Sequence, residues 1–288
     1  MVSGKAEKPS KPQKKKTSFK NPKSHTNFKN IKKQPPATIN PKNKNKNKKN
    51  DIHQINDKKQ HNNKELSPAS ASQQLSFFID EFQSANGLQL SSLELESIKE
   101  TSFLELSKEL GQDVNALGKQ MKAAFGSSWK EVLCERQLVE GKIEAGNPAV
   151  LIISTSALRV IEILRGVRSL TKECHAAKLF SKHMKVEEQV TLLEDRVNFA
   201  SGTPSRVKKL IDIEALGLSR LAVVVLDIHT DVKGYSLLTL PQVRDEFWDL
   251  YKNYFHQRLI QGSLRICLFG PLPNGNVLRG KKKKAADE

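Results

Sequence analysis

One carboxylate in this sequence stands where phosphate-transfer proteins often place a magnesium ligand. Asp227 directly follows the apolar run Val223–Leu226, which predicts a buried strand, and an aspartate at such a strand end can direct a metal ion. The next residues, Ile228, His229 and Thr230, supply no carboxylate that could position an attacking water. We therefore interpret Asp227 as a loop or cap-satisfying carboxylate, with a metal role as the alternative, and His229 as a loop residue.

A loop that binds nucleoside triphosphates needs two glycines, a lysine and a hydroxyl residue at fixed spacing, because the glycines let backbone amides surround the phosphates. No such run occurs in the sequence. The nearest candidate is Gly118–Lys119, but Asp113 occupies the first glycine position and Gln120 the hydroxyl position. No order of serine, histidine and aspartate, or of cysteine and histidine, stands out for nucleophilic catalysis either. We therefore expect no enzyme activity, no catalytic residues, no cofactor and no bound metal.

Hydroxyl and basic residues, by contrast, gather after the expected strands. Thr203 suits the N-cap of a helix and Pro204 suits its first position, so a helix start is predicted there. Residues 156–185 hold seven Lys or Arg against two Glu, a net charge of +5 (7 − 2). Hydroxyls, helix starts and positive charge are the groups that bind phosphate. The sequence therefore predicts an extended anion-binding surface.

The elements that would position these residues lie between residues 148 and 273. Here short apolar runs alternate with amphipathic segments, which predicts strands at 150–154, 177–180, 197–201, 222–226 and 264–269, and helices at 156–168, 186–193, 204–213 and 242–254. Continuous apolar strands separated by helices are typical of a parallel sheet covered on both faces. The predicted fold class is therefore α/β, with a single parallel sheet whose carboxyl edge carries the hydroxyl and basic residues.

Residues 73–147 are predicted to form a helical N-terminal part of the same domain. Apolar residues at helical spacing precede Gly87, a plausible C-cap, and further helices are expected to begin near Ser92 and Ser127. Residues 77–118 hold eight acids and two lysines, a charge of −6 (2 − 8), which suits either a solvated helix surface or a contact for a basic partner. The expected core aromatics are Phe77, Phe78, Phe82, Trp129 and Trp248.

The positive charge of the chain is concentrated in its first residues. Residues 1–64 hold 19 Lys and three acids, a net charge of +16 (19 − 3), whereas the whole chain has +17. Low hydrophobicity predicts a disordered lysine-rich tail over residues 1–72, and residues 274–288 are expected to form a second flexible basic end. Such a polycation binds phosphate backbones through counterion release, with little sequence preference. The alternative is a tail that only increases solubility.

No transmembrane or secretory segment is evident, because the longest apolar runs are far too short to span a bilayer and no apolar stretch follows the first lysines. We therefore expect a soluble intracellular protein. Cys134, Cys174 and Cys267 are widely spaced and odd in number, which argues against a disulfide framework or a zinc site. They are interpreted as buried thiols.

The chain order of four motifs resembles the first RecA-like domain of DEAD-box RNA helicases. STSAL at 154–158, TPSR at 203–206, VVVLD at 223–227 and CLFG at 267–270 correspond to helicase PTREL, TPGR, a strand ending in DEAD and a strand ending in SAT. This resemblance implies that Thr155, Thr203 and Arg206 hold an RNA backbone. Ser156 and Ser205 replace the Arg and Gly of the helicase motifs, which weakens that expectation, and the ATP-binding motif is missing.

A more specific resemblance covers about residues 148–273. LFSKHMKVEEQV at 179–190 and SGTPSRVKKLI at 201–211 resemble the Cms-one family, small nucleolar proteins with a lysine-rich N-terminus and a degenerate DEAD-box-like domain. The resemblance implies association with the small-subunit pre-ribosome, its pre-rRNA and its proteins, in the nucleus and nucleolus. It implies neither a membrane nor a small-molecule substrate.

We therefore predict a non-catalytic RNA- or ribonucleoprotein-binding factor in small ribosomal subunit biogenesis and rRNA processing. The alternatives are an active RNA-dependent ATPase of the helicase type, and a protein-docking scaffold that contacts RNA only through its tail. For Lys182 and Lys185 a solvated loop is the competing interpretation. The predicted RNA-binding residues are Thr155, Arg159, Lys182, Lys185, Thr203, Arg206, Lys208 and Lys209 in the domain, and Lys14, Lys15, Lys16, Lys48 and Lys49 in the tail.

Overall fold

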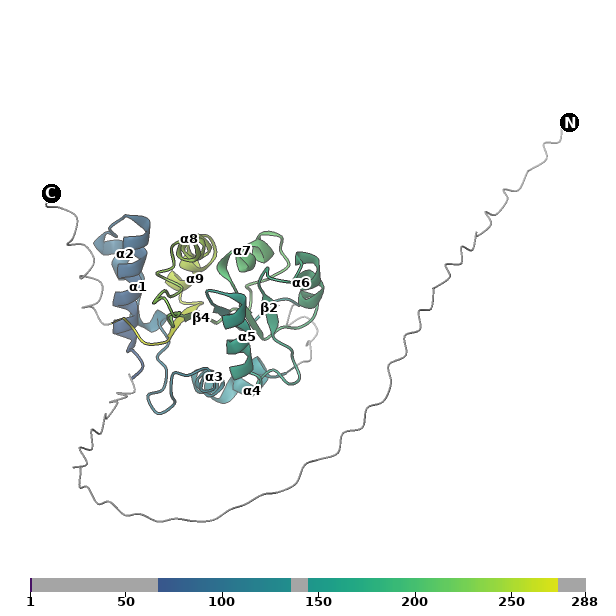
Figure 1. Ribbon diagram of the computed structural model, residues 1–288, viewed down its shortest axis with the longest axis horizontal. Coiled ribbons are helices and arrows are strands. Elements are labelled where there is room, and N and C mark those ends of the chain that lie inside the picture. The colour runs from purple at the N-terminus through teal and green to yellow at the C-terminus, as the bar shows by residue number, and fades with distance from the viewer. Residues whose placement is uncertain (2–66, 136–144, 274–288) are drawn as a thin grey trace, which may run out of the picture. The chain divides into compact units, whose positions relative to one another are not determined.

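The computed structural model describes residue 1, residues 67–135 and residues 145–273. From residue 67 onward, the described chain folds around one central β-sheet (Figure 1). Most of the predicted N-terminal tail, with the five lysines singled out there, and the predicted basic end at 274–288 lie outside the described residues.

The sheet in the described part of the chain has five parallel strands in the order β2-β3-β1-β4-β5. Nearly every strand residue is buried, which explains the continuous apolar runs of β1 and β4. The predicted fold class is confirmed, although β3 begins and ends later than expected. The strands are β1 (Val150–Ile153), β2 (Ala177–Leu179), β3 (Phe199–Gly202), β4 (Val223–Asp227) and β5 (Arg265–Phe269).

Helices cover both faces of the sheet. Successive strand residues point to opposite faces and therefore belong to two separate apolar clusters. In β1, Leu151 belongs to the cluster that holds side chains of α1, α6, α7, α8 and α9, whereas Val150 and Ile152 pack against α3, α4 and α5. Figure 1 shows α7, α8 and α9 above the sheet and α3 and α4 below it. The helices are α1 (Ala71–Asn86), α2 (Ser92–Ser97), α3 (Leu117–Phe125), α4 (Trp129–Leu133), α5 (Ala157–Gly166), α6 (Val186–Leu193), α7 (Pro204–Asp212), α8 (Pro241–Leu250) and α9 (His256–Ile260).

The first helix begins at Ala71, inside the range predicted as tail. Ser70 forms its N-cap, and Ser70 and Gln73 complete a capping box in which each side chain bonds the backbone of the other residue. This pair satisfies two N–H groups that a helix start leaves without partners. Gly87 ends the helix with φ of 61°, so the predicted C-cap is confirmed.

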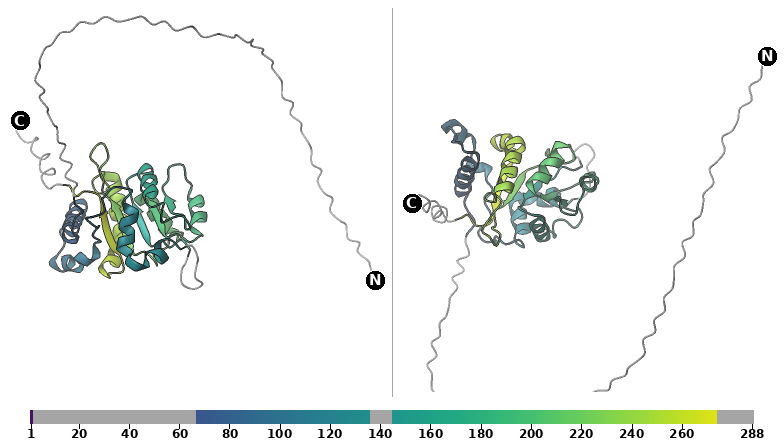
Figure 2. Two further views of the ribbon diagram at one scale, coloured as in Figure 1. Left: turned by 90° about the horizontal axis from the view of Figure 1, so that it is seen from below. Right: turned by 45° about the horizontal axis from the view of Figure 1, so that its top comes forward.

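The segment predicted as helical over residues 73–147 is in fact partly irregular. Residues 103–116 and 145–149 are not helical, α3 was not predicted, and the helix expected near residue 127 starts as α4 after a 3₁₀ turn at Gly126–Ser128. The segment extends the sheet, since Leu104 N–H donates to Ile266 O at 2.7 Å. Gln74 of α1 bonds Leu104 O at 3.0 Å and Leu268 N–H at 2.9 Å. Figure 2 shows α1 and α2 on the β5 side of the sheet, consistent with one continuous domain.

An aromatic cluster packs α1 onto α8. Phe78 and Phe82 of α1 both meet Trp248 and Tyr251 edge to face, with ring centroids 5.1–5.6 Å apart. Tyr251 starts a π-helical turn, Tyr251–Phe255, so the predicted helix at 242–254 is α8 continued through this turn into α9. The expected core positions of Phe78, Phe82 and Trp248 are confirmed, whereas Phe77 and Trp129 are half-buried.

The three cysteines are free thiols. Cys174 and Cys267 are buried, as predicted, while Cys134 is partly exposed. Burial raises the pKa of the Cys267 thiol to about 12, so this group stays protonated near neutral pH. Among the described helices, none combines the length and apolar character that a bilayer span requires.

Candidate nucleic-acid interface

The carboxyl ends of the strands meet at one edge of the sheet, which we call the carboxyl edge. The register places Ile153 of β1 beside Gly202 on one side and beside Leu226 on the other, so the residues that follow β1, β3 and β4 are neighbours. After β1 the chain enters α5 on one face, whereas α7 and α8, which follow β3 and β4, pack on the opposite face. Connections that leave in opposite directions create a crevice for ligands. The hydroxyl and basic residues that follow β1, β3 and β4 therefore lie side by side at this edge, while their binding of an anion stays a prediction.

Asp227, the last residue of β4, is buried and forms an ion pair. Arg159 of α5 donates from Nε to Asp227 Oδ2 at 2.7 Å and from Nη2 to Oδ1 at 3.1 Å. His229 Nδ1 lies 2.8 Å from Oδ1, and its ring meets Phe269 edge to face. Glu162, one turn further along α5, accepts a hydrogen bond from Arg159 Nη1 at 2.9 Å. Both carboxylate oxygens of Asp227 therefore have partners within the chain.

This arrangement corrects the interpretation of Asp227 as a loop or cap carboxylate, because the residue ends a strand and bonds two side chains. It also places Arg159, predicted as an RNA contact, in an internal network. Burial lowers the pKa of the Arg159 guanidinium, but its hydrogen bonds and attraction to Asp227 and Glu162 outweigh this effect and raise the pKa above its ordinary value. The arginine stays charged and bonds both carboxylate oxygens of Asp227 as a bidentate pair.

A second network shapes the loop between β2 and α6. Arg206 of α7 donates from Nη1 to Gln189 Oε1 at 2.7 Å and to Met184 O at 3.3 Å. Gln189, fully buried in α6, donates to Phe180 O at 3.0 Å and to Lys178 O at 2.8 Å. Arg206 thus holds the loop over residues 181–185 against the start of α7. Sequence reasoning did not single out Gln189, because a glutamine in an amphipathic helix carries no sign of burial.

The other residues predicted to contact RNA differ in how exposed their side chains are. Lys182 and Lys185 are exposed in the loop that Arg206 holds, and Lys209 is exposed on α7. Thr155 and Thr203 are half-buried at the carboxyl edge. Thr203 occupies the N-cap position of α7, as expected, but its side chain makes no capping hydrogen bond.

Lys208 points toward acidic neighbours on the α7–α8 surface. Its Nζ lies 3.0 Å from Asp212 Oδ2 and 3.7 Å from Asp249 Oδ2. The hydrogen bond and charge of Asp212 raise the pKa of Lys208, and the Tyr254 hydroxyl donates a hydrogen bond to the same carboxylate. Of the residues predicted in the domain, the carboxyl edge brings together Thr155, Arg159, Lys182, Lys185, Thr203 and Arg206, while Lys208 and Lys209 lie along α7.

Comparison with known proteins identifies the family. The model of the CMS1 family, described as U3-containing 90S pre-ribosomal complex subunit, matches residues 5–269. This chain belongs to the CMS1 family. The resemblance to the Cms-one family noted from residues 179–190 and 201–211 is therefore confirmed.

Curated members of the family match the chain over part of its length. Human protein CMSS1 is 33% identical over 147 residues, which cover 50% of this chain and 53% of that protein. Protein CMS1 of Chaetomium thermophilum is 37% identical over 106 residues, which cover 36% of this chain and 42% of its own. The chain thus spans about half the length of the curated relatives it matches.

Helicases are also similar to this chain. Nucleolar RNA helicase 2-B of Xenopus laevis is 33% identical over 106 residues, which cover 36% of this chain and 13% of the helicase. A DEAD box protein of Methanococcus jannaschii has 18% identity and a TM-score of 0.35, covering 70% of this chain and 53% of that one. Dbp5 of S. cerevisiae has 11% identity and a TM-score of 0.38, covering 70% of this chain and 48% of that one.

Proposed function

We propose that this protein is a non-catalytic RNA- and ribonucleoprotein-binding factor of small ribosomal subunit biogenesis, acting in the nucleus and nucleolus. Membership in a family of 90S pre-ribosomal complex subunits supports the assignment to ribosome assembly. Its partners are then pre-rRNA and pre-ribosomal proteins. The lysine-rich first 64 residues supply sequence-independent affinity for phosphate, and the carboxyl edge orients the domain on its target.

The Arg159–Asp227 ion pair is the observation that carries the non-catalytic assignment. A magnesium ion at Asp227 would have to displace a bidentate guanidinium bonded at 2.7 and 3.1 Å. The sequence has no glycine-rich loop with lysine and hydroxyl to hold the phosphates. Among the described residues, no three His, Cys, Asp or Glu side chains gather as a metal site would require. The negative charge of Asp227, which a metal ion would neutralise, is already neutralised by Arg159.

We expect the full-length protein to show no saturable binding of Mg²⁺-ATP and no phosphate release above buffer, with or without RNA. The physical reason is that the sequence lacks the phosphate-binding loop and that both carboxylate oxygens of Asp227 are bonded within the chain. A fluorescent ATP analogue and a phosphate-release assay make the measurement. Asp227→Asn, which keeps a hydrogen-bonding side chain, serves as the control. Saturable binding with turnover that this variant abolishes would instead establish an RNA-dependent ATPase.

Removal of residues 1–64 is expected to weaken RNA binding strongly and to flatten its salt dependence. On a single strand, each phosphate that the protein no longer neutralises lowers the slope of log affinity against log salt by about 0.7. Titration of labelled single-stranded RNA at several salt concentrations measures both effects.

In the truncated protein, Lys182→Glu combined with Lys185→Glu is expected to weaken the remaining affinity further. Lys99→Glu combined with Lys252→Glu changes two exposed lysines away from the carboxyl edge and controls for net charge. If residues 65–288 bind no RNA even at low salt, the domain is a protein-docking module instead, and RNA contact belongs to the tail alone.

A further inference from the structure

A large groove lies on the flank of the domain, beside the edge strand β2. Its volume is about 1330 Å³. One wall comes from the end of α5 and the following turn, residues 161–176, and the other from the end of α6 and the turn before β3, residues 192–197. Met184 lines it as well. We call this feature the flank groove.

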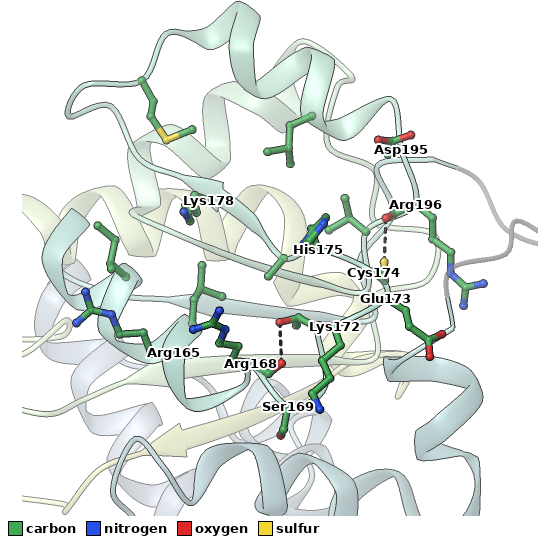
Figure 3. Close-up of a pocket in the computed structure, with 17 residues that line it drawn as sticks. Arg165, Arg168, Ser169, Lys172, Glu173, Cys174, His175, Lys178, Asp195 and Arg196 are labelled. Atoms are coloured by element: carbon green, nitrogen blue, oxygen red, sulfur yellow. Dashed lines mark hydrogen bonds between the residues drawn. The ribbon is translucent and has the colours of Figure 1, made fainter.

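Four exposed cationic side chains line the flank groove: Arg165, Arg168, Lys172 and Lys178. None of these four side chains forms an ion pair or a hydrogen bond with another residue that the structure describes. Figure 3 shows Arg165, Arg168 and Lys178 around one end of the groove, while Glu173 and Asp195 lie toward the other end. Arg165, Arg168 and Lys178 are therefore not neutralised by these two acids.

Some cations elsewhere on the described domain form ion pairs with acidic side chains. Arg159 is bonded to Asp227, Lys208 to Asp212, and Arg244 to Asp245. Like charges gathered in a concave site focus the electrostatic potential and attract counterions, since a low-dielectric wall limits screening. Four exposed cations without internal partners, gathered along one concave site, point to an anionic ligand of the groove.

The remaining lining residues indicate which part of a nucleic acid the groove would contact. Apart from His175, the uncharged residues along it are small polar or aliphatic, such as Leu164, Leu192 and Val197. No Phe, Tyr or Trp lines it among the described residues. Base-stacking platforms on single strands are built from aromatic rings. The groove therefore suits phosphate and ribose rather than the bases.

We infer that the flank groove binds the phosphodiester backbone of a single RNA strand, an inference that rests on the RNA-binding function proposed above. Met184 connects the groove to the carboxyl edge, because Arg206 bonds its carbonyl oxygen at 3.3 Å. Lys182 and Lys185 lie on the same loop. A strand contacting the carboxyl edge can therefore continue past this loop into the groove, between Lys178 and the end of α5.

A single strand fits the shape of the flank groove better than a duplex does. Arg165, Arg168 and Lys172 lie on the α5 wall and Lys178 lies on β2 between the two walls. A narrow backbone can follow these cations along the groove, whereas a duplex is a wide rod that reaches only the rim. Contacts to the backbone alone predict little sequence preference and a steep dependence on salt. An acidic peptide is the competing ligand, but it would offer one charge per side chain without the regular charge spacing of RNA.

The test uses the full chain carrying Arg165→Glu, on the α5 wall of the groove, and Lys178→Glu, on β2. Because two fewer phosphates are then neutralised, the slope of log affinity against log salt is expected to fall by about 1.4, twice the value of about 0.7 for one phosphate on a single strand. Labelled single-stranded RNA of mixed sequence is the probe. Lys99→Glu with Lys252→Glu, which makes the same charge change on two exposed lysines away from the carboxyl edge and the groove, is expected to leave the slope nearly unchanged. Circular dichroism melting confirms that both variants fold.

Three results would overturn the inference. Equal effects of the groove variant and the control variant would mean that only net charge matters. Equal sensitivity of an RNA duplex to the groove variant would exclude a single-strand groove, and tighter binding of a poly-glutamate peptide, abolished in the groove variant, would identify an acidic protein partner.

The same experiment separates this inference from the proposed function. If wild type binds RNA, and Lys182→Glu with Lys185→Glu weakens it while the groove variant does not, only the groove assignment fails. If the full-length protein binds no RNA at all, both fail.

Discussion

Replacing Phe78 by alanine is expected to destabilise the folded domain by about 3–5 kcal/mol, the usual cost of removing a buried aromatic ring. The side chain is 1% exposed. It meets Phe103, Trp248 and Tyr251 edge to face, with centroids 5.1–5.6 Å apart. Alanine would leave a cavity between α1 and α8 that these rings cannot fill without leaving their own packing positions. Urea unfolding followed by tryptophan fluorescence measures the destabilisation, because Trp248 lies in the same cluster.

Phe77→Ala is the matched control, since it removes the same ring from the adjacent position of α1, where the side chain is only half-buried. Its effect is expected to be clearly smaller. The comparison decides whether α1 belongs to the cooperative unit. If Phe78→Ala leaves the unfolding midpoint unchanged, residues 71–86 pack on the sheet without contributing to its stability, and the single-domain description of residues 67–273 is wrong.

The fold could be predicted where local pattern and long-range packing agree. Val223–Leu226 is apolar throughout because both faces of β4 are covered, and the start of α7 is marked by Pro204 at its first position. Helix α3, which the sequence analysis did not predict, has weaker sequence signals for its start than α7 has. Ala116 stands at its N-cap without a side-chain hydrogen bond. Gly118 lies inside it, where an added Cβ would come 3.1 Å from Gly166 O, so the glycine that discourages a helix prediction allows α3 to pack closely against the end of α5.

The candidate site could be predicted only in part, for a different reason. The sequence indicated the residues at each strand end, and a parallel sheet brings strand ends together, so the carboxyl edge was correctly placed. It did not indicate which side chains bond one another across the edge. Arg159 and Asp227 are 68 residues apart, and Arg206 and Gln189 are 17 apart. Arg159, expected to contact RNA, and Asp227, expected to satisfy a loop, are bonded to each other. The pattern and spacing of residues along the sequence do not reveal such a pair.

Replacing Arg159 by leucine is expected to destabilise the domain by about 3–5 kcal/mol, because it leaves the carboxylate of Asp227 buried without its countercharge. Asp227 is 1% exposed, so water cannot replace the two hydrogen bonds at 2.7 and 3.1 Å. The remaining partner, His229, contacts only Oδ1. Denaturant unfolding at neutral pH measures the destabilisation.

The double variant Arg159→Leu with Asp227→Leu is expected to recover most of that stability, since exchanging a whole buried ion pair for apolar residues is often neutral or favourable. Lys208→Leu breaks a surface pair with Asp212 and is expected to change stability little, because exposed pairs contribute little. The recovery distinguishes two roles for Arg159. If the double variant is stable and still binds RNA as wild type does, the arginine serves to neutralise Asp227. If it is stable but binds RNA more weakly, although its net charge is unchanged, the guanidinium also contacts RNA, as the sequence alone had suggested.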